Sequence, residues 1–212
     1  MSGERRAVSG ARGAARAGSG APGLGVRRLG HMDDADAAAA VARAREAVER
    51  AARVLAEASA RTETLAEFVP GRRVLGVPRA PRMHVVGPVW RLGVLLLDAE
   101  GRLFATGRVV RAERAVRKSI TAGSVAEHRA YRAAAIKGGI PEGETVDFDA
   151  EPLPLDTAAL AAGEGPLRLL RGEDGSRFVG VRWNPAFADA MLPLDAYLAE
   201  RVDLLVHPPQ GA

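Results

Sequence analysis

The chain has 212 residues, of which 47% are hydrophobic and 26% charged, a formal net charge of +4 and no cysteine. The lack of cysteine excludes disulfides, thiolate metal sites and a cysteine nucleophile. The longest apolar run, residues 92–97, is much shorter than a membrane-spanning helix. We therefore expect a soluble, cytoplasmic protein with no membrane partner.

The excess of basic charge lies at the start of the chain. Residues 1–31 hold six arginines and one glutamate, which leaves 24 basic and 25 acidic residues for 32–212. The stretch GSGAPG at 18–23 has the dinucleotide-binding spacing G-x-G-x-x-G, but its surroundings predict neither the strand nor the helix that such a site needs. We expect no cofactor there and interpret 1–31 as a disordered leader. A translation start at Met32 is the favoured explanation of the leader, and an organellar transit peptide is the alternative.

Residues 32–61 are predicted to form an N-terminal amphipathic helix, with 33–60 helical. Three aspartates, at 33, 34 and 36, would lie in its first turn and oppose the positive end of the helix dipole. An apolar stripe recurs every seven residues at Val41, Val48 and Leu55. Two uses of the stripe remain open, which are packing against the chain's own domain and self-association of two copies through residues 33–60.

A single domain is predicted for 62–212. Thr64 and Glu67 form a capping box, which predicts a short helix that ends before Pro70. The prolines at 78 and 81 then predict an extended linker. Residues 83–111 have the pattern of strands, with a hairpin around the turn at 99–102 and a central strand at 94–97 that is covered on both faces.

The second half of the chain alternates helices and strands. A capping box at Ser124 and Glu127 predicts a helix that stops at two glycines, 138 and 139, and 144–149 reads as a strand. The motif LPLD occurs at 153–156 and 192–195 and predicts two helix starts, with a hairpin at 167–183 between them and a last helix at 196–206.

These elements predict an α+β fold. We expect a largely antiparallel sheet of about five strands, built from two hairpins and packed with three to four helices, after a long N-terminal helix.

Two segments carry opposite charge. Residues 102–118 contain six basic residues and one acid, whereas 141–156 contain six acids and no base. We expect the two segments to lie close together and to neutralise each other. This pairing makes nucleic acid an unexpected partner.

Candidate catalytic residues are few. The four histidines do not have metal-ligand spacing, so we expect no metal site. His128 and Tyr131 share a helix face and are the candidate catalytic residues, with His128 as a general base; a structural, hydrogen-bonded role is the alternative. Asp147 and Asp149 form a possible carboxylate pair, but in a strand we expect both to face solvent on one side.

Four blocks of sequence suggest a relationship: EFVPGRR, WRLGVLLLDAEGRLFATGRVVRA, EHRAYRAAAIKGGIPEGETVDFD and PLDAYLAERVDLLVHPPQGA. Together they resemble a family of small actinobacterial proteins often labelled glutaminases. The resemblance implies hydrolysis of the side-chain amide of glutamine to glutamate and ammonia. Known glutaminases use a Ser and Lys pair or a cysteine. This chain has no cysteine and no serine followed by lysine three residues later, so no catalytic residue is carried over.

Two functions follow from this sequence, ahead of a general nucleic-acid binder, which comes third. The first is a small protein that binds a partner or a second copy of itself. The alternative is a glutaminase-like amide hydrolase that uses His128.

Overall fold

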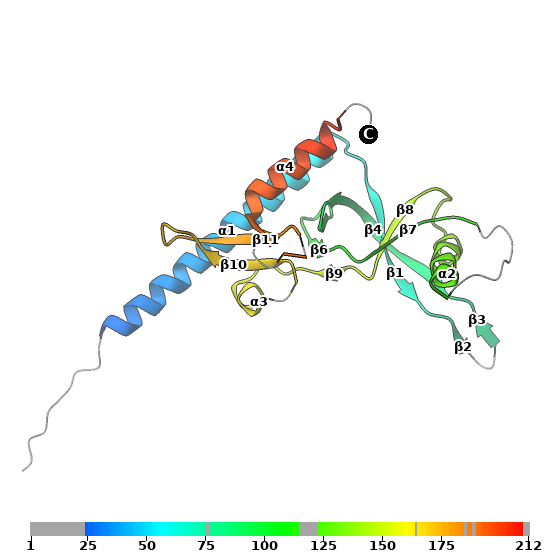
Figure 1. Ribbon diagram of the computed structural model, residues 1–212, viewed down its shortest axis with the longest axis horizontal. Coiled ribbons are helices and arrows are strands. Elements are labelled where there is room, and N and C mark those ends of the chain that lie inside the picture. Colours follow the sequence, from blue (N-terminus) through cyan, green and yellow to red (C-terminus); the bar gives the residue numbers. More distant parts are fainter. Residues whose placement is uncertain are drawn as a thin grey trace, which may run out of the picture.

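The computed structural model describes residues 24–74, 77–114, 123–163, 165–184, 186–187 and 190–209. In this part of the chain the protein has four helices, a seven-stranded mixed sheet and two smaller sheets (Figure 1). The predicted α+β class and the N-terminal helix are therefore confirmed. The prediction of about five strands in two hairpins is wrong, because short strands form where the sequence indicated a helix and a linker.

The helices are α1 (Leu24–Glu57), α2 (Gly123–Lys137), α3 (Thr157–Ala162) and α4 (Leu194–Val206). The prediction for α1 is wrong at its start, because the helix begins nine residues before Asp33 and residues 24–31 are helical. Asp33 therefore does not lie in the first turn. It forms ion pairs with Arg171 and Arg177 at 2.5 and 3.7 Å. The rest of the proposed leader, residues 1–23, lies outside the described residues.

The seven-stranded sheet has the order β7-β8-β1-β4-β5-β6-β9. Its strands are β1 (Glu63–Val69), β4 (Arg82–Leu92), β5 (Leu95–Leu97), β6 (Leu103–Ala105), β7 (Arg108–Arg111), β8 (Thr145–Phe148) and β9 (Glu151–Pro152). β1 and β8 are parallel, and the other neighbours are antiparallel.

The strand pairing closes this sheet into a small barrel. Only Thr106 and Gly107 separate β6 from β7, and only Asp149 and Ala150 separate β8 from β9. The stretch from β6 to β7 therefore runs beside the stretch from β8 to β9, because β6 pairs with β9 and β7 pairs with β8. This pairing joins the two ends of the sheet. Both stretches bend where they cross: Asp149 has φ 56°, and a Cβ on Gly107 would overlap the carbonyl oxygens of Phe148 and Asp149.

The barrel has an interior and two covered outer faces. Leu65, Val89, Leu96 and Phe104 meet inside it, one from each of four strands. Part of the outer surface packs under α2, where the buried residues include Val110, Val146 and Phe148. Another part joins the largest core, which is shared with α1, α4 and the three-stranded sheet. The predicted central strand is confirmed, because Leu95, Leu96 and Leu97 are all fully buried.

The three-stranded sheet contains β10 (Leu167–Arg171), β11 (Arg177–Arg182) and β12 (Met191–Pro193), all antiparallel. The predicted hairpin at 167–183 is therefore confirmed. α1 and α4 lie side by side against it (Figure 1). The apolar stripe of α1 is buried there: Val41, Val48 and Leu55 are 4%, 1% and 0% exposed. The stripe thus packs within its own chain, which is the first of its two expected uses.

One further prediction fails locally. The predicted helix at Thr64 is strand β1, because pairing with β4 and β8 on both sides outweighs a local capping box in so short a segment. Between β4 and β5 the chain turns at Gly93, which has φ +64°. The Tyr197 hydroxyl of α4 bridges this turn by donating to Leu92 O at 2.8 Å and accepting from Val94 N at 3.0 Å.

The repeated LPLD motif has two different outcomes. Asp156 caps α3, accepting a hydrogen bond from Ala159 N at 2.8 Å, as expected. In the second copy Leu192 and Pro193 belong to β12, and Asp195 makes no capping bond at the start of α4. The prediction for Asp195 is therefore wrong, because strand pairing carries the chain directly into the helix.

The predicted linker is a two-stranded antiparallel ribbon, which we call the arginine ribbon. It consists of β2 (Arg72–Val74) and β3 (Val77–Arg79). It projects from the end of β1 and β4, away from α1 and α4 (Figure 1). Pro78 lacks an N–H donor, but it is tolerated because a ribbon has only edge strands.

Candidate functional site

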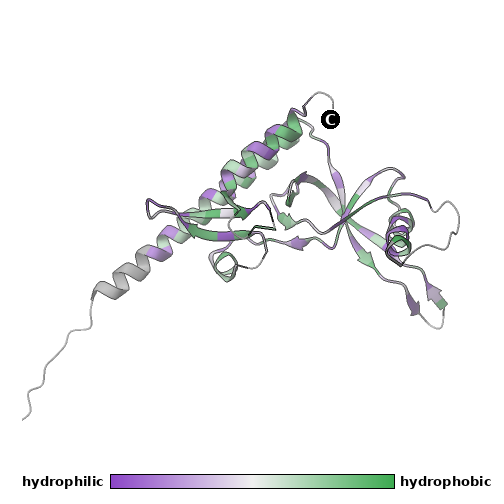
Figure 2. Cartoon of the chain, in the orientation of Figure 1, coloured by the Kyte–Doolittle hydropathy of each residue, from purple (hydrophilic) through white to green (hydrophobic). Residues whose placement is uncertain are grey.

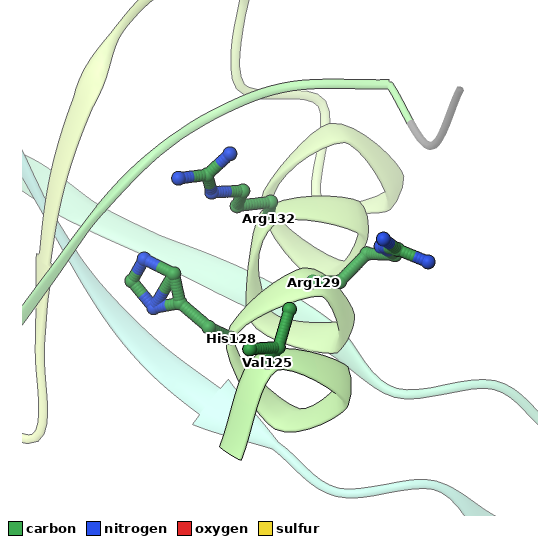
Figure 3. Close-up of a pocket in the computed structure, with 4 residues that line it drawn as sticks. All are labelled: Val125, His128, Arg129 and Arg132. Atoms are coloured by element: carbon green, nitrogen blue, oxygen red, sulfur yellow. The ribbon is translucent and has the colours of Figure 1, made fainter. Parts of the chain in front are cut away.

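The two candidate catalytic residues lie on α2 beside the barrel. His128 and Tyr131 both line a surface depression of about 300 Å³, together with Arg108 and Glu127. His128 is exposed and also borders a second depression with Val125, Arg129 and Arg132 (Figure 3). The structure thus brings the two residues together at the surface. Their catalytic role remains a prediction.

Tyr131 is held by its neighbours. Its ring packs against Phe68 and Phe148, with centroid distances of 4.9 and 4.8 Å. Its hydroxyl donates to Glu127 Oε1 at 2.6 Å and makes a short contact with Arg108. The hydrogen bond to Glu127 is the main reason that the pKa of Tyr131 is raised. The packing of its ring and the two contacts of its hydroxyl favour a structural role for Tyr131.

A charged cluster that the sequence did not predict lies inside the barrel. Glu63 precedes Leu65 by two residues, Arg91 follows Val89 by two, and Asp147 pairs with Leu65 in register. All three side chains therefore project to the interior face. Arg91 Nε donates to Glu63 Oε2 at 2.8 Å, and its Nη2 makes a short hydrogen bond with Asp147 Oδ1.

Asp147 and Asp149 do not form the expected solvent-facing pair. Asp147 is fully buried, whereas Asp149 is exposed at the bend between β8 and β9. The expectation is wrong because barrel closure turns one side of β8 inward and the bend at Asp149 interrupts the alternation of the strand. The carboxylate that accompanies Asp147 is instead Glu63, from a strand more than eighty residues earlier in the chain.

The burial of Asp147 changes its protonation. Burial, and then the neighbouring Glu63, raise the pKa of Asp147 to about 7. Its Oδ2 atom faces no hydrogen-bond donor among the described residues. Two ionised carboxylates both accept, so a bond between them needs a proton on one of them. Burial acts to raise the pKa of Glu63 as well, but the hydrogen bond with Asp147 and the charge of Arg91 lower it overall. At pH 7 Asp147 is therefore about half protonated, beside an ionised Glu63.

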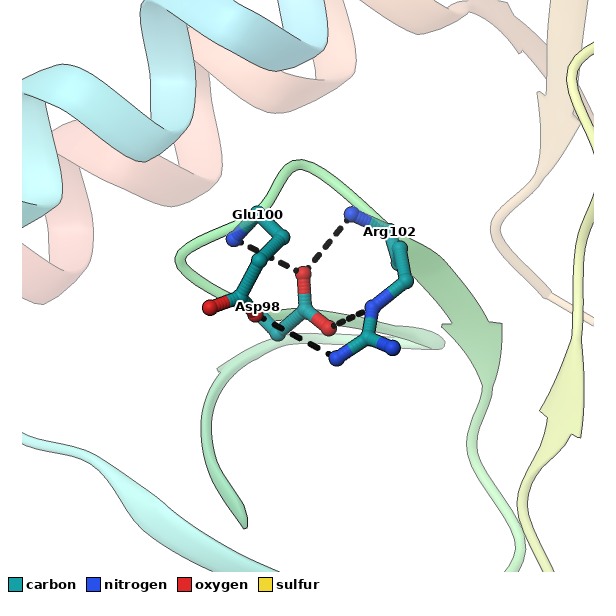
Figure 4. A network of polar contacts seen from close by, with 3 residues as sticks. All are labelled: Asp98, Glu100 and Arg102. Carbon is teal, nitrogen blue, oxygen red and sulfur yellow. Dashed lines mark hydrogen bonds and ion pairs between the residues drawn. The ribbon is translucent and has the colours of Figure 1, made fainter. Parts of the chain in front are cut away.

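A second buried carboxylate is structural. Asp98 is 4% exposed in the turn between β5 and β6. Its Oδ1 accepts from the backbone N–H groups of Glu100 and Arg102 at 3.1 and 2.8 Å, and its Oδ2 accepts from Arg102 Nε at 2.6 Å (Figure 4). These bonds account for both oxygens, so the role of Asp98 is to close the hairpin.

The predicted neutralisation of the two charged segments is found in part, for Arg108 and Arg114, whereas Arg111 forms no ion pair among the described residues. β7 pairs with β8, which places Arg108 3.8 Å from Asp149. Arg114 lies 3.4 Å from Glu142. Arg102 instead bonds Asp98, within its own hairpin. Residues 115–118 of the basic segment lie outside the described residues.

The arginine ribbon is the other basic feature, and it is not neutralised in this way. Residues 68–97 contain five arginines and no acid, and four of these arginines lie in or beside the ribbon: Arg72, Arg73, Arg79 and Arg82. All four are exposed, and in the described part of the chain none forms a side-chain hydrogen bond or ion pair. Arg72 lies directly opposite Arg79 in the ribbon register. Figure 2 shows the ribbon as mostly hydrophilic.

The sequence contains a signal for the ribbon that the prediction of a linker overlooked. RRV and VPR flank a Leu-Gly pair almost symmetrically, which is typical of two short strands around a turn. For the barrel cluster the local sequence gives no comparable signal.

No described helix is long and apolar enough to cross a membrane. Within the described ranges, no group of three or more His, Asp or Glu side chains could hold a metal ion. Comparison of the chain with family models, with curated proteins and with solved structures finds no match.

Proposed function

We propose that this protein is a binding module that contacts a polyanionic partner through the arginine ribbon. The observation that carries the proposal is the cross-strand pair of Arg72 and Arg79, exposed and, among the described residues, without an acidic neighbour to which either is bonded. Like charges directly opposite each other destabilise a strand pair. A polyanion lying across both guanidinium groups would remove that repulsion. The strand pair of the ribbon would therefore be more stable when the polyanion is bound than when the ribbon is free.

The apolar stripe of α1 is not available to bind a partner. Its large residues are buried against α4 and the three-stranded sheet of the same chain. A second copy could use the stripe only if α1 first left its own core. The proposal therefore places partner binding at the opposite end of the molecule.

Heparin–agarose chromatography tests the proposal. The double variant Arg72→Gln/Arg79→Gln should elute at clearly lower salt than the wild-type protein. The matched control is Arg50→Gln/Arg53→Gln, which removes the same charge from the exposed face of α1 and should elute close to wild type. The six arginines of residues 1–31 are present in every variant, so their contribution cancels. Equal shifts for the two variants would contradict the proposal.

A second candidate function, amide hydrolysis, is favoured by one observation. A carboxylic acid that is still protonated near pH 7 next to an ionised carboxylate is the arrangement that general acid–base catalysis uses, and Asp147 and Glu63 form such a pair. Glu63 and Arg91 are 18% and 27% exposed, so the cluster opens to solvent on their side.

Release of ammonia from glutamine tests this second function. If the barrel cluster is the site, Asp147→Asn abolishes the release and His128→Ala leaves it unchanged. If the residues on α2 are the site, the result is the reverse. Wild-type protein without ammonia release would exclude glutamine hydrolysis.

A further inference from the structure

We infer that the polyanion is a B-form DNA duplex and that the arginine ribbon lies in its major groove. This inference rests on the proposed function and names its partner.

The shape of the ribbon fits this groove. Two paired strands lie about 4.8 Å apart, and a major groove about 12 Å wide admits a two-stranded ribbon with its side chains. Each ribbon strand has three residues, which extend about 10 Å at 3.3 Å per residue, comparable with the groove depth of about 8.5 Å. In the described part of the chain β2 and β3 pair with each other and with no third strand. No described strand therefore stands beside the ribbon to block its entry into the groove.

The arginines are distributed over both faces of the ribbon. Arg72 and Arg79 are paired and share one face, whereas Arg73, opposite Pro78, projects from the other. A ribbon in a groove has a phosphate backbone along each wall, so charge on both faces meets phosphate on both sides. Arg82 pairs with Val69 at the base of the ribbon, where β4 begins, and can reach the rim of the groove. A flat anionic surface would contact only one face.

The composition of the ribbon argues against other nucleic acids. Single strands are bound mainly by stacking of bases on aromatic side chains, and residues 69–89 contain no Phe, Tyr or Trp. The major groove of duplex RNA is too deep and narrow for side chains to read. One apolar side chain near the ribbon tip, Val77, is 64% exposed. In B-form DNA such a side chain can contact the thymine methyl group.

Fluorescence anisotropy with one labelled DNA duplex, its separate single strand, the corresponding RNA duplex and labelled heparin tests the inference. We expect wild-type protein to bind the DNA duplex at least about tenfold more tightly than the single strand or the RNA duplex. Arg72→Gln/Arg79→Gln should weaken duplex binding about tenfold or more. It should also reduce the slope of log K against log salt by about 2, because each phosphate contact contributes about 0.9. The control Arg50→Gln/Arg53→Gln should change neither value.

The outcomes separate this inference from the proposed function. If wild-type protein binds heparin, DNA and RNA with similar affinity, and the ribbon variant loses affinity for all three equally, the ribbon is a general polyanion site. The DNA inference is then overturned. If the ribbon variant binds every probe as wild type does, both fail. A circular dichroism melt of each variant shows whether it is folded, and because the ribbon is exposed we expect the melts to coincide with wild type.

Discussion

Three arginines of the barrel and α2 differ from those of the arginine ribbon in what surrounds them. Arg91, Arg108 and Arg132 each form an ion pair with a carboxylate from another part of the chain, at 2.8, 3.1 and 2.6 Å for Glu63, Glu127 and Glu113. Those of the ribbon form no such pair within the described residues. A basic segment in a sequence therefore does not always form a basic surface. Ion pairs neutralise these three arginines of the barrel and α2, whereas the arginines of the ribbon keep a charge that a partner can contact.

The largest effect is expected at Arg91, the arginine with the most buried partners. Arg91→Met leaves Asp147 and Glu63 without their cation, and removal of one partner from a buried ion pair costs about 3 kcal/mol. Urea unfolding measures the loss in the free energy of unfolding. Arg73→Met, in the ribbon, is the control and should change that free energy by less than about 0.5 kcal/mol. Similar losses of stability for both variants would contradict the proposed difference between the barrel and the ribbon.

The second prediction concerns pH. The pKa of Asp147 is raised from 3.8 to about 7 by burial and Glu63, so the folded state holds a proton that the unfolded state has lost. The contribution of Asp147 to the free energy of unfolding therefore falls as pH rises from about 4 to about 7, by up to about 1.4 kcal/mol per pH unit.

Asp147→Asn tests this pH dependence. The amide can donate to Glu63 and accept from Arg91, and it does not ionise. Its stability relative to wild type should increase by about 2 kcal/mol between pH 5 and pH 8 in urea unfolding. Asp149→Asn, at an exposed position, should show no such increase. An Asp147→Asn variant with the pH profile of wild type would rule out a buried proton.

The third prediction separates stability from binding in the ribbon. Arg79→Glu replaces a repulsive cross-strand pair by an attractive one opposite Arg72, and should raise the free energy of unfolding by about 0.5 kcal/mol. The same change should weaken heparin binding. Thermal unfolding and heparin elution measure the two effects. A variant that is both less stable and unchanged in elution would show that the ribbon arginines are not repelling each other.

The smallest effect is expected for the exposed pair of Arg114 and Glu142, whose side chains are 77% and 53% exposed. A double-mutant cycle with alanine at both positions should give a coupling free energy below about 0.5 kcal/mol, because water and salt screen exposed ions. A value above about 1.5 kcal/mol would mean that this pair is held as rigidly as the barrel cluster.

Some of the fold could be predicted from local signals alone. α2 is confirmed because its helical residues end at two glycines, 138 and 139, and the hairpin of β10 and β11 surrounds a turn rich in Gly, Asp and Ser. β1 could not be predicted, since its seven residues form a strand only through pairing with two distant strands. Of the candidate site residues, Tyr131 was placed correctly on a helix face, but its partner Arg108 comes from β7. Helix periodicity carries no information about that contact.

The amino-acid sequence by itself determined the α+β class, the apolar stripe of α1 and the absence of acids between Glu67 and Asp98. These follow from residue type and spacing over a few turns or strands. Only the tertiary structure decided which charges remain unpaired and which carboxylate is buried. Closing the barrel brings Glu63, Arg91 and Asp147 together from three strands that are far apart in the chain. The protonation of Asp147 and the free charge of the ribbon depend on distances in space, which no local pattern specifies.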